Sequence, residues 1–267
     1  MKPLLRVRNL SLSFRGLKAV EDVSFDVPTG RIVGLIGPNG AGKSSLLNCL
    51  SRIYVPSSGS VEFDGIDLLS KPVHALAPLG ISRTFQNLEL FTEATVLENV
   101  LVGAIHKYRR SVFADLLRLP HTRRSRRDAV SEASALVSEL GLAPYAHAQV
   151  SGLAYGIQKS VELARALAGE PRLLLLDEPA AGMNPEESRQ LGRTIRMLQR
   201  DRGITVLLVE HDMRLVMSAC DLIVVLVQGR KLCEGVPAQI RRDPRVIEVY
   251  LGEEDPLPEP AELQEVA

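Results

Sequence analysis

The chain is poor in cysteine: its 267 residues include only Cys49, Cys220 and Cys233. Their spacing fits neither a metal site nor a disulfide framework, and an odd number suits a reducing compartment. Every apolar run is far shorter than the roughly 20 residues that a membrane-spanning helix needs. Because the chain opens Met1-Lys2-Pro3 and continues directly into a strand pattern, we expect no signal peptide. These absences predict a cytosolic protein.

A net charge is also absent, since 32 Lys and Arg balance 32 Asp and Glu. The overall charge therefore gives no indication that the protein binds nucleic acid. The charges are distributed unevenly, however. Residues 103–127 are strongly basic and contain a single acid, whereas the charged residues of 253–267 are all acids and are accompanied by several prolines. We expect the latter segment to be a flexible tail. With 45% hydrophobic and 24% charged residues, the remainder has the composition of a globular protein with an ample core.

The run from Gly37 to Ser44 fits the phosphate-binding pattern G-x-x-x-x-G-K-[ST]. An apolar strand pattern over 31–36 precedes it, and a helix pattern over 44–50 follows. Glycines in such a loop let successive backbone N–H groups point at one anion, and the helix N-terminus adds partial positive charge. The predicted nucleotide-binding residues are Gly37, Pro38, Asn39, Gly40, Ala41, Gly42, Lys43, Ser44 and Ser45.

The pattern of elements predicts an α/β fold. Alternating residues over 5–10 and 19–27 predict antiparallel strands that turn near Arg15-Gly16, and 59–65 predicts another short strand. Helical patterns follow at 95–105, 127–140 and 157–168. All-apolar strands at 173–176, 204–209 and 222–227 are typical of a parallel sheet covered on both faces, and a charged helix is predicted over 186–200. We therefore expect an α/β core with a helical subdomain inserted at about 87–168.

Polar residues that follow apolar strands supply candidates for hydrolysis. Asp177 ends the strand at 173–176, where it can orient a Mg²⁺ shell, and Glu178 is placed to polarise the attacking water. Gln86 could bind Mg²⁺ or the water, and His211 could reach the γ-phosphate. A lone Gln or His at a strand end is usually only solvated. Because Gln86 and His211 follow a phosphate loop in this order, a role in hydrolysis is favoured for both.

In this order and spacing, the residues resemble the ATP-binding subunits of ABC transporters over about residues 4–251. The resemblance implies a P-loop NTPase fold, a RecA-like core with an N-terminal antiparallel β-subdomain and an inserted α-helical subdomain, over residues 1–252. It identifies Walker A, the Q-loop at Gln86, Walker B at Asp177-Glu178 and the switch histidine His211. It implies ATP and Mg²⁺ as ligands, with Ser44, Gln86 and Asp177 near the metal and Glu178, His211 and Gln86 catalytic. Phe14 is the expected adenine platform, although a core-facing aromatic is the alternative.

The family's signature segment falls at Leu153, Ala154, Tyr155 and Gly156, and it departs from L-S-G-G-Q because Ala154, Tyr155 and Ile157 replace Ser, Gly and Gln. The resemblance implies that this segment caps the γ-phosphate bound to the opposite subunit of a head-to-tail dimer. Ala-Tyr at these positions is similar to the LivG-type ATPases of branched-chain amino-acid importers. Other segments of the chain are similar to that subgroup too, among them Arg83-Thr84-Phe85-Gln86-Asn87 and Glu210-His211-Asp212-Met213.

The resemblance further implies partners: integral membrane permeases, a second ATP-binding subunit in a homo- or heterodimer, and indirectly a periplasmic or extracellular substrate-binding protein, but no nucleic acid. We expect a cytoplasmic protein, peripheral on the inner face of a bacterial plasma membrane. The basic stretch 103–127 either faces anionic lipid or is a solvated helix surface. Urea or amide import, an export-type system, a soluble ATPase acting on DNA or ribosomes, and an inactive regulatory subunit are the alternatives. Ile157 favours the last, and Glu178 and His211 argue against it.

Overall fold

The computed structural model describes residues 2–107 and 120–250, in two compact units. The first unit comprises the described residues of Met1–Leu76 and Arg172–Ala267, and the second those of Ala77–Pro171. Residues 108–119 of the basic stretch 103–127 and the acidic tail 253–267 lie outside the described residues.

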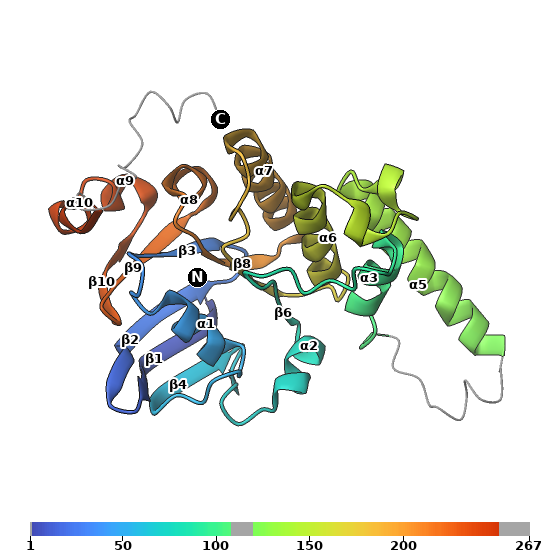
Figure 1. The fold of residues 1–267 in the computed structure, drawn as a ribbon. Coiled ribbons are helices and arrows are strands. Elements are labelled where there is room, and N and C mark those ends of the chain that lie inside the picture. The colour runs from blue at the N-terminus through green and yellow to red at the C-terminus, as the bar shows by residue number, and fades with distance from the viewer. Residues whose placement is uncertain (1, 108–119, 251–267) are drawn as a thin grey trace. The chain divides into compact units, whose positions relative to one another are not determined.

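The first unit contains two sheets (Figure 1). Its strands are β1 (Pro3–Phe14), β2 (Leu17–Pro28), β3 (Ile32–Ile36), β4 (Ser58–Phe63), β5 (Ile66–Asp67), β7 (Leu173–Asp177), β8 (Thr205–Val209), β9 (Leu222–Val227) and β10 (Arg230–Gly235). The antiparallel sheet has the order β2-β1-β4-β5. The other sheet follows the order β10-β9-β3-β8-β7 in this unit, with β9, β3, β8 and β7 parallel and β10 antiparallel to β9.

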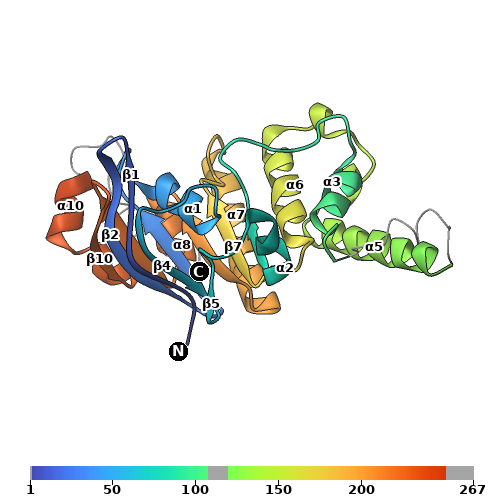
Figure 2. The same ribbon diagram turned by 90° about the horizontal axis from the view of Figure 1, so that it is seen from below.

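The parallel strands are buried on both faces, as their apolar runs predicted. Every residue of β3, β7 and β8 is buried. The helices of the unit are α1 (Lys43–Leu50), α7 (Pro185–Arg202), α8 (Met213–Ala219), α9 (Pro237–Ile240) and α10 (Pro244–Tyr250), with the 3-10 turn η1 (Val73–Ala75). Helix α1 contacts both β2 and β7, and Figure 2 shows it between the two sheets. A Cβ on Gly34 in β3 would meet side-chain atoms of Val216 in α8 and of Cys220, which follows α8.

The turn between β1 and β2 was also predicted correctly. Phe14 pairs with Leu17, so the loop is Arg15-Gly16. Both loop residues have positive φ, 47° and 91°, which is the backbone of a two-residue hairpin turn whose twist matches that of the strands.

The second unit is mainly helical. Its elements are α2 (Leu76–Leu79), which begins one residue before the unit, β6 (Ile81–Arg83), α3 (Val96–Gly103), α5 (Pro120–Glu139), the 3-10 turns η2 (Ala143–Tyr145) and η3 (Val150–Gly152), and α6 (Tyr155–Leu167). Helix α3 begins at a capping box formed by Thr95 and Glu98 and packs against both α5 and α6. A Cβ on Gly103 would lie 1.9 Å from the carbonyl oxygen of Arg165, so glycine permits this close approach of α3 and α6.

The three helices predicted in this part of the chain are therefore present, and their ends lie within about two residues of the predicted ones except at the start of α5. Helix α5 begins at Pro120 and not at Arg127. The prediction depended on apolar periodicity, and residues 120–126 contain almost no apolar side chains.

Candidate nucleotide-binding site

The phosphate loop lies between β3 and α1, where the sequence predicted it, and its backbone requires glycine at two positions. Gly37 has a φ of 151°, and a Cβ there would lie 2.1 Å from the carbonyl oxygen of Leu226. Gly42 has a φ of 96°, and a Cβ there would lie 2.3 Å from the carbonyl oxygen of Ala19. Both glycines therefore combine a left-handed backbone with a close approach of another chain segment.

Lys43 is buried against the loop that precedes it, with 6% of its surface exposed. Its Nζ donates hydrogen bonds to the carbonyl oxygens of Gly37, at 2.6 Å, and Pro38, at 3.0 Å. Gly42 is the N-cap of α1, and among the described residues no side chain caps that terminus. The first backbone N–H groups of α1 are thus the donors that an anion would meet.

Two of the residues predicted to lie near a metal, Ser44 and Asp177, carry oxygen donors and belong to the first unit. Ser44 is exposed in the first turn of α1, and Asp177 is buried at the carboxyl end of β7, with 4% of its surface exposed. A hydroxyl and a carboxylate suit Mg²⁺, which takes one or two protein ligands and completes its shell with phosphate oxygens and water. The described residues contain no group of three or more His, Cys, Asp or Glu side chains that could hold a metal by themselves.

Glu178 and His211 come together where β7 and β8 end. Glu178 has a φ of 46°, an uncommon conformation for a non-glycine residue, and its N–H donates to the carbonyl of Val209 at 2.9 Å. This contact joins the two strand ends. As a result, Nδ1 of His211 lies 4.0 Å from Oε2 of Glu178. The Glu178 side chain is 15% exposed and that of His211 is 57% exposed, so the pair lies at the surface.

Sequence reasoning assigned no role to Glu210, which the structure places at the centre of this region. Glu210 is fully buried, and its Oε1 accepts a hydrogen bond from the N–H of Ala180 at 2.8 Å. Its Oε2 accepts from the N–H groups of His211, at 3.1 Å, and Asp212, at 3.4 Å. Burial raises the pKa of Glu210 above its ordinary value, although these N–H groups oppose the shift. Its contact with Ala180 spans 30 positions, so no local sequence signal reveals it.

Phe14 lies near the end of β1 with 42% of its surface exposed, so it is not a core residue. Its ring meets that of Tyr54 edge to face, with centroids 5.2 Å apart and an interplanar angle of 78°. This contact fixes the orientation of an aromatic side chain that still offers exposed area.

The remaining predicted residues are described within the second unit. Gln86 is exposed and follows β6 in the chain. Ala154 is the N-cap of α6, and Tyr155 and Gly156 form its first turn; no described side chain caps this helix N-terminus. Leu153 precedes them, and its carbonyl accepts a hydrogen bond from Nε2 of Gln158 at 2.8 Å. The signature segment thus presents the start of a helix, as expected from its sequence.

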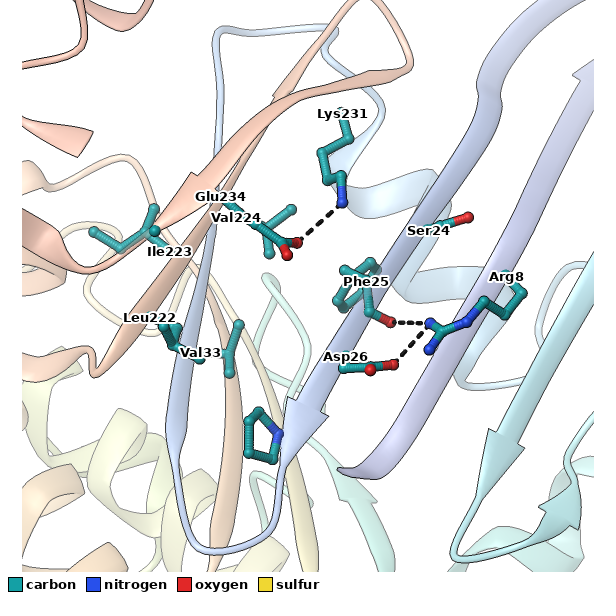
Figure 3. A pocket seen from close by; sticks show the side chains of 12 residues that line it. Arg8, Ser24, Phe25, Asp26, Val33, Leu222, Ile223, Val224, Lys231 and Glu234 are labelled. Atoms are coloured by element: carbon teal, nitrogen blue, oxygen red, sulfur yellow. Dashed lines mark hydrogen bonds and ion pairs between the residues drawn. The ribbon is translucent and has the colours of Figure 1, made fainter. Parts of the chain in front are cut away.

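A groove elsewhere in the first unit, with a volume of about 480 Å³, involves none of the predicted residues (Figure 3). It lies between β1 and β2 on one side and β9 and β10 on the other. Arg8 and Asp26 form an ion pair at 2.7 Å on one wall, and Lys231 and Glu234 form another at 3.0 Å. Because these charges are compensated within the groove, it is not our candidate site.

A glycine-rich loop between a buried parallel strand and a helix, with an acidic pair at the end of a second strand, defines a P-loop nucleotide-binding domain. The ABC transporter family model matches residues 20–181. A second model, described as branched-chain amino acid ATP-binding cassette transporter, matches residues 230–256. The chain belongs to the ABC transporter family.

The curated relatives and solved structures agree with this assignment. The chain is 44% identical to the high-affinity branched-chain amino acid transport ATP-binding protein BraF of Pseudomonas aeruginosa over 94% of the chain and 99% of that protein. It is 34% identical to the lipopolysaccharide export system ATP-binding protein LptB of Escherichia coli K12, over 94% of the chain and 98% of LptB. A nucleotide-free ATP-binding cassette from an ABC transporter matches with a TM-score of 0.81 and 32% identity, covering 94% of this chain and all of that one. Within residues 2–107 and 120–250, no helix is long and apolar enough to cross a membrane.

Proposed function

We propose that this chain is the ATP-binding and ATP-hydrolysing subunit of an ABC importer for branched-chain or related amino acids. The observation that carries the proposal is its similarity, along nearly the whole chain, to relatives named for branched-chain amino acid transport. The similarity to the lipopolysaccharide export relative is lower over the same length.

The nucleotide binds through the residues of the first unit. The backbone N–H groups of the phosphate loop and of the first turn of α1 hold the phosphates, and Phe14 stacks on the adenine. Lys43 exchanges its two loop carbonyls for the β- and γ-phosphates. This exchange requires only a side-chain movement, because the loop backbone already has its left-handed glycines.

Hydrolysis uses the strand ends of the parallel sheet. Ser44, Gln86 and Asp177 would hold Mg²⁺, which would supply positive charge to balance the charge that develops on the phosphate oxygens. Glu178 accepts a proton from the attacking water, and His211, within 4.0 Å of its carboxylate, orients the water and the γ-phosphate. The buried Glu210 keeps both of these residues in place through its backbone hydrogen bonds.

The functional unit is a head-to-tail dimer of ATP-binding subunits. Leu153, Ala154, Tyr155 and Gly156 of one subunit complete the site of the other, where the open N-terminus of α6 meets the γ-phosphate. ATP then makes contacts that only the closed dimer offers, so it shifts the population toward closure. This motion is coupled to integral membrane permeases at the inner face of the plasma membrane. A substrate-binding protein delivers the transported substrate to the permeases on the other side of the membrane.

The first test is Mg²⁺-dependent ATP hydrolysis by the purified chain and by the chain co-purified with its permeases. We expect Glu178→Gln to abolish turnover while ATP binding persists. Glu234→Gln is the matched control, because Glu234 lies in the groove of Figure 3 and pairs with Lys231. ATP binding without turnover in the wild-type complex would contradict the enzymatic role and favour a regulatory subunit.

The substrate is tested by reconstituting the complex in proteoliposomes. We expect leucine, isoleucine or valine, delivered by the binding protein, to accumulate in an ATP-dependent manner. ATP-dependent movement of a lipid in the outward direction would instead identify an export system.

A further inference from the structure

Helix α6 carries two buried charged side chains that the proposed reaction does not use. Lys159 is 5% exposed and Glu162 is 2% exposed, and their Nζ and Oε2 atoms lie 3.6 Å apart on one face of the helix. Buried Lys and Glu are rare and are usually paired. The burial of this pair on α6 therefore needs a specific explanation.

Both side chains bind the main chain of the segment that contains Gln86. Oε1 of Glu162 accepts a hydrogen bond from the N–H of Phe85 at 3.1 Å. Nζ of Lys159 donates to the carbonyl oxygen of Gln86 at 3.0 Å. The two charges thus hold an N–H and a carbonyl of adjacent residues, and hydrogen bonds to charged groups are the stronger class.

Two further contacts extend this connection along α6. Arg165, one turn after Glu162, donates to the carbonyl oxygen of Glu89. At the other end of the helix, Nζ of Lys159 lies 5.8 Å from the centre of the Tyr155 ring, in cation–π geometry. Lys159 therefore contacts both Tyr155, which belongs to the signature segment, and the main chain of Gln86.

We propose that Lys159 and Glu162 are positioning residues that fix the backbone at Gln86 to the start of α6, so that the Gln86 side chain and the signature segment move together. We call this pair the α6 clamp. The inference rests on the proposed function, in which Gln86 acts in hydrolysis and the signature segment completes the partner's site. The clamp acts on turnover and not on nucleotide affinity, since the phosphate loop belongs to the other unit.

The test compares Lys159→Met and Glu162→Leu with Glu162→Gln, which keeps an acceptor for the N–H of Phe85. In the complex with its permeases, we expect the first two to lower kcat for ATP about 10- to 100-fold, the scale for a misplaced reacting group, with KM within about twofold. Glu162→Gln should retain most of the activity. Lys107→Met is the matched control, because Lys107 pairs with Glu132 and Glu170 in the same unit at 2.7 Å each.

Amide hydrogen exchange of the peptide over 83–90 supplies a readout independent of activity. We expect exchange to accelerate there in Lys159→Met and Glu162→Leu and to stay as in wild type in Glu162→Gln and Lys107→Met. The double variant Lys159→Met/Glu162→Leu leaves no uncompensated buried charge, and it provides a folded test if a single variant is unstable.

Unchanged kcat in Lys159→Met and Glu162→Leu would overturn the proposal, as would acceleration of exchange throughout the second unit in place of 83–90. If the wild-type complex does not hydrolyse ATP, the proposed function fails, whereas the exchange experiment still decides whether the clamp exists.

Discussion

The carboxylate of Glu210 and the backbone N–H of Ala180 are joined by a hydrogen bond of 2.8 Å. This contact connects the segment that follows Glu178 to the segment that begins with His211. A fully buried carboxylate therefore sets the relative position of two residues that the proposed hydrolysis uses together.

We expect Glu210→Ala to lower the free energy of unfolding by about 1–3 kcal/mol, because the N–H of Ala180 would stay buried without an acceptor. Glu210→Gln keeps one acceptor oxygen and should lose less. Urea unfolding of the three proteins measures the difference. Equal stability of wild type and Glu210→Ala would show that the contact with Ala180 contributes nothing net.

Gly37 and Gly40 provide a matched pair in the phosphate loop. In Gly37→Ala, the new Cβ would lie 2.1 Å from the carbonyl oxygen of Leu226, so we expect loss of ATP binding together with a lower melting temperature. Gly40 also has a positive φ, 77°, but no described atom would lie within 4 Å of a Cβ there. Gly40→Ala should therefore cost only about 1–3 kcal/mol of backbone strain. Thermal unfolding and binding of a fluorescent ATP analogue measure both; similar losses in the two variants would refute the role of the Leu226 contact.

Phe14→Ala should weaken ATP binding about 2- to 13-fold, which corresponds to the roughly 0.5–1.5 kcal/mol of an aromatic stacking contact. Leu17→Ala is the control, because Leu17 pairs with Phe14 across the hairpin and is 73% exposed. Equilibrium titration with ATP and with a triphosphate that lacks the base distinguishes stacking from a general change of the site. An equal loss for both ligands would contradict the adenine role.

Glu162 makes the stability of the protein depend on pH. Burial raises the pKa of its carboxyl above the ordinary value of 4.5, against the opposing effects of the Phe85 N–H and Lys159. The folded protein therefore holds this proton more tightly than the unfolded chain, so the stabilisation is complete below that value and is lost as the pH rises through the folded-state pKa. We expect the unfolding free energy of wild type, relative to that of Glu162→Gln, to decrease as the pH is raised from about 4 toward 8. A difference that stays constant over this range would show that Glu162 titrates equally in both states.

The fold and the loop residues could be predicted because their signals are local. The strand, the glycine loop and the helix of the predicted phosphate site follow one another between Ile32 and Leu50, and the hairpin turn is contained in Arg15-Gly16. The roles of Glu210, Lys159 and Glu162 could not be predicted. Lys159 binds the carbonyl of Gln86, which lies 73 positions away in the chain. Each of these side chains binds a backbone group, and every residue type carries the same backbone groups, so the sequence does not indicate the partner.

The two hydrogen bonds from Lys43 to the loop carbonyls have a consequence for the entropy of nucleotide binding. The ammonium group binds two successive carbonyl oxygens and so holds the loop in a curved shape by contacts within the chain. The entropy of ordering this segment is thereby lost when the domain folds and not when the nucleotide binds. Nucleotide binding would then require movement of the Lys43 side chain and little rearrangement of the loop backbone. Under the proposed function, a conformational change that is coupled to transport would therefore arise outside this loop.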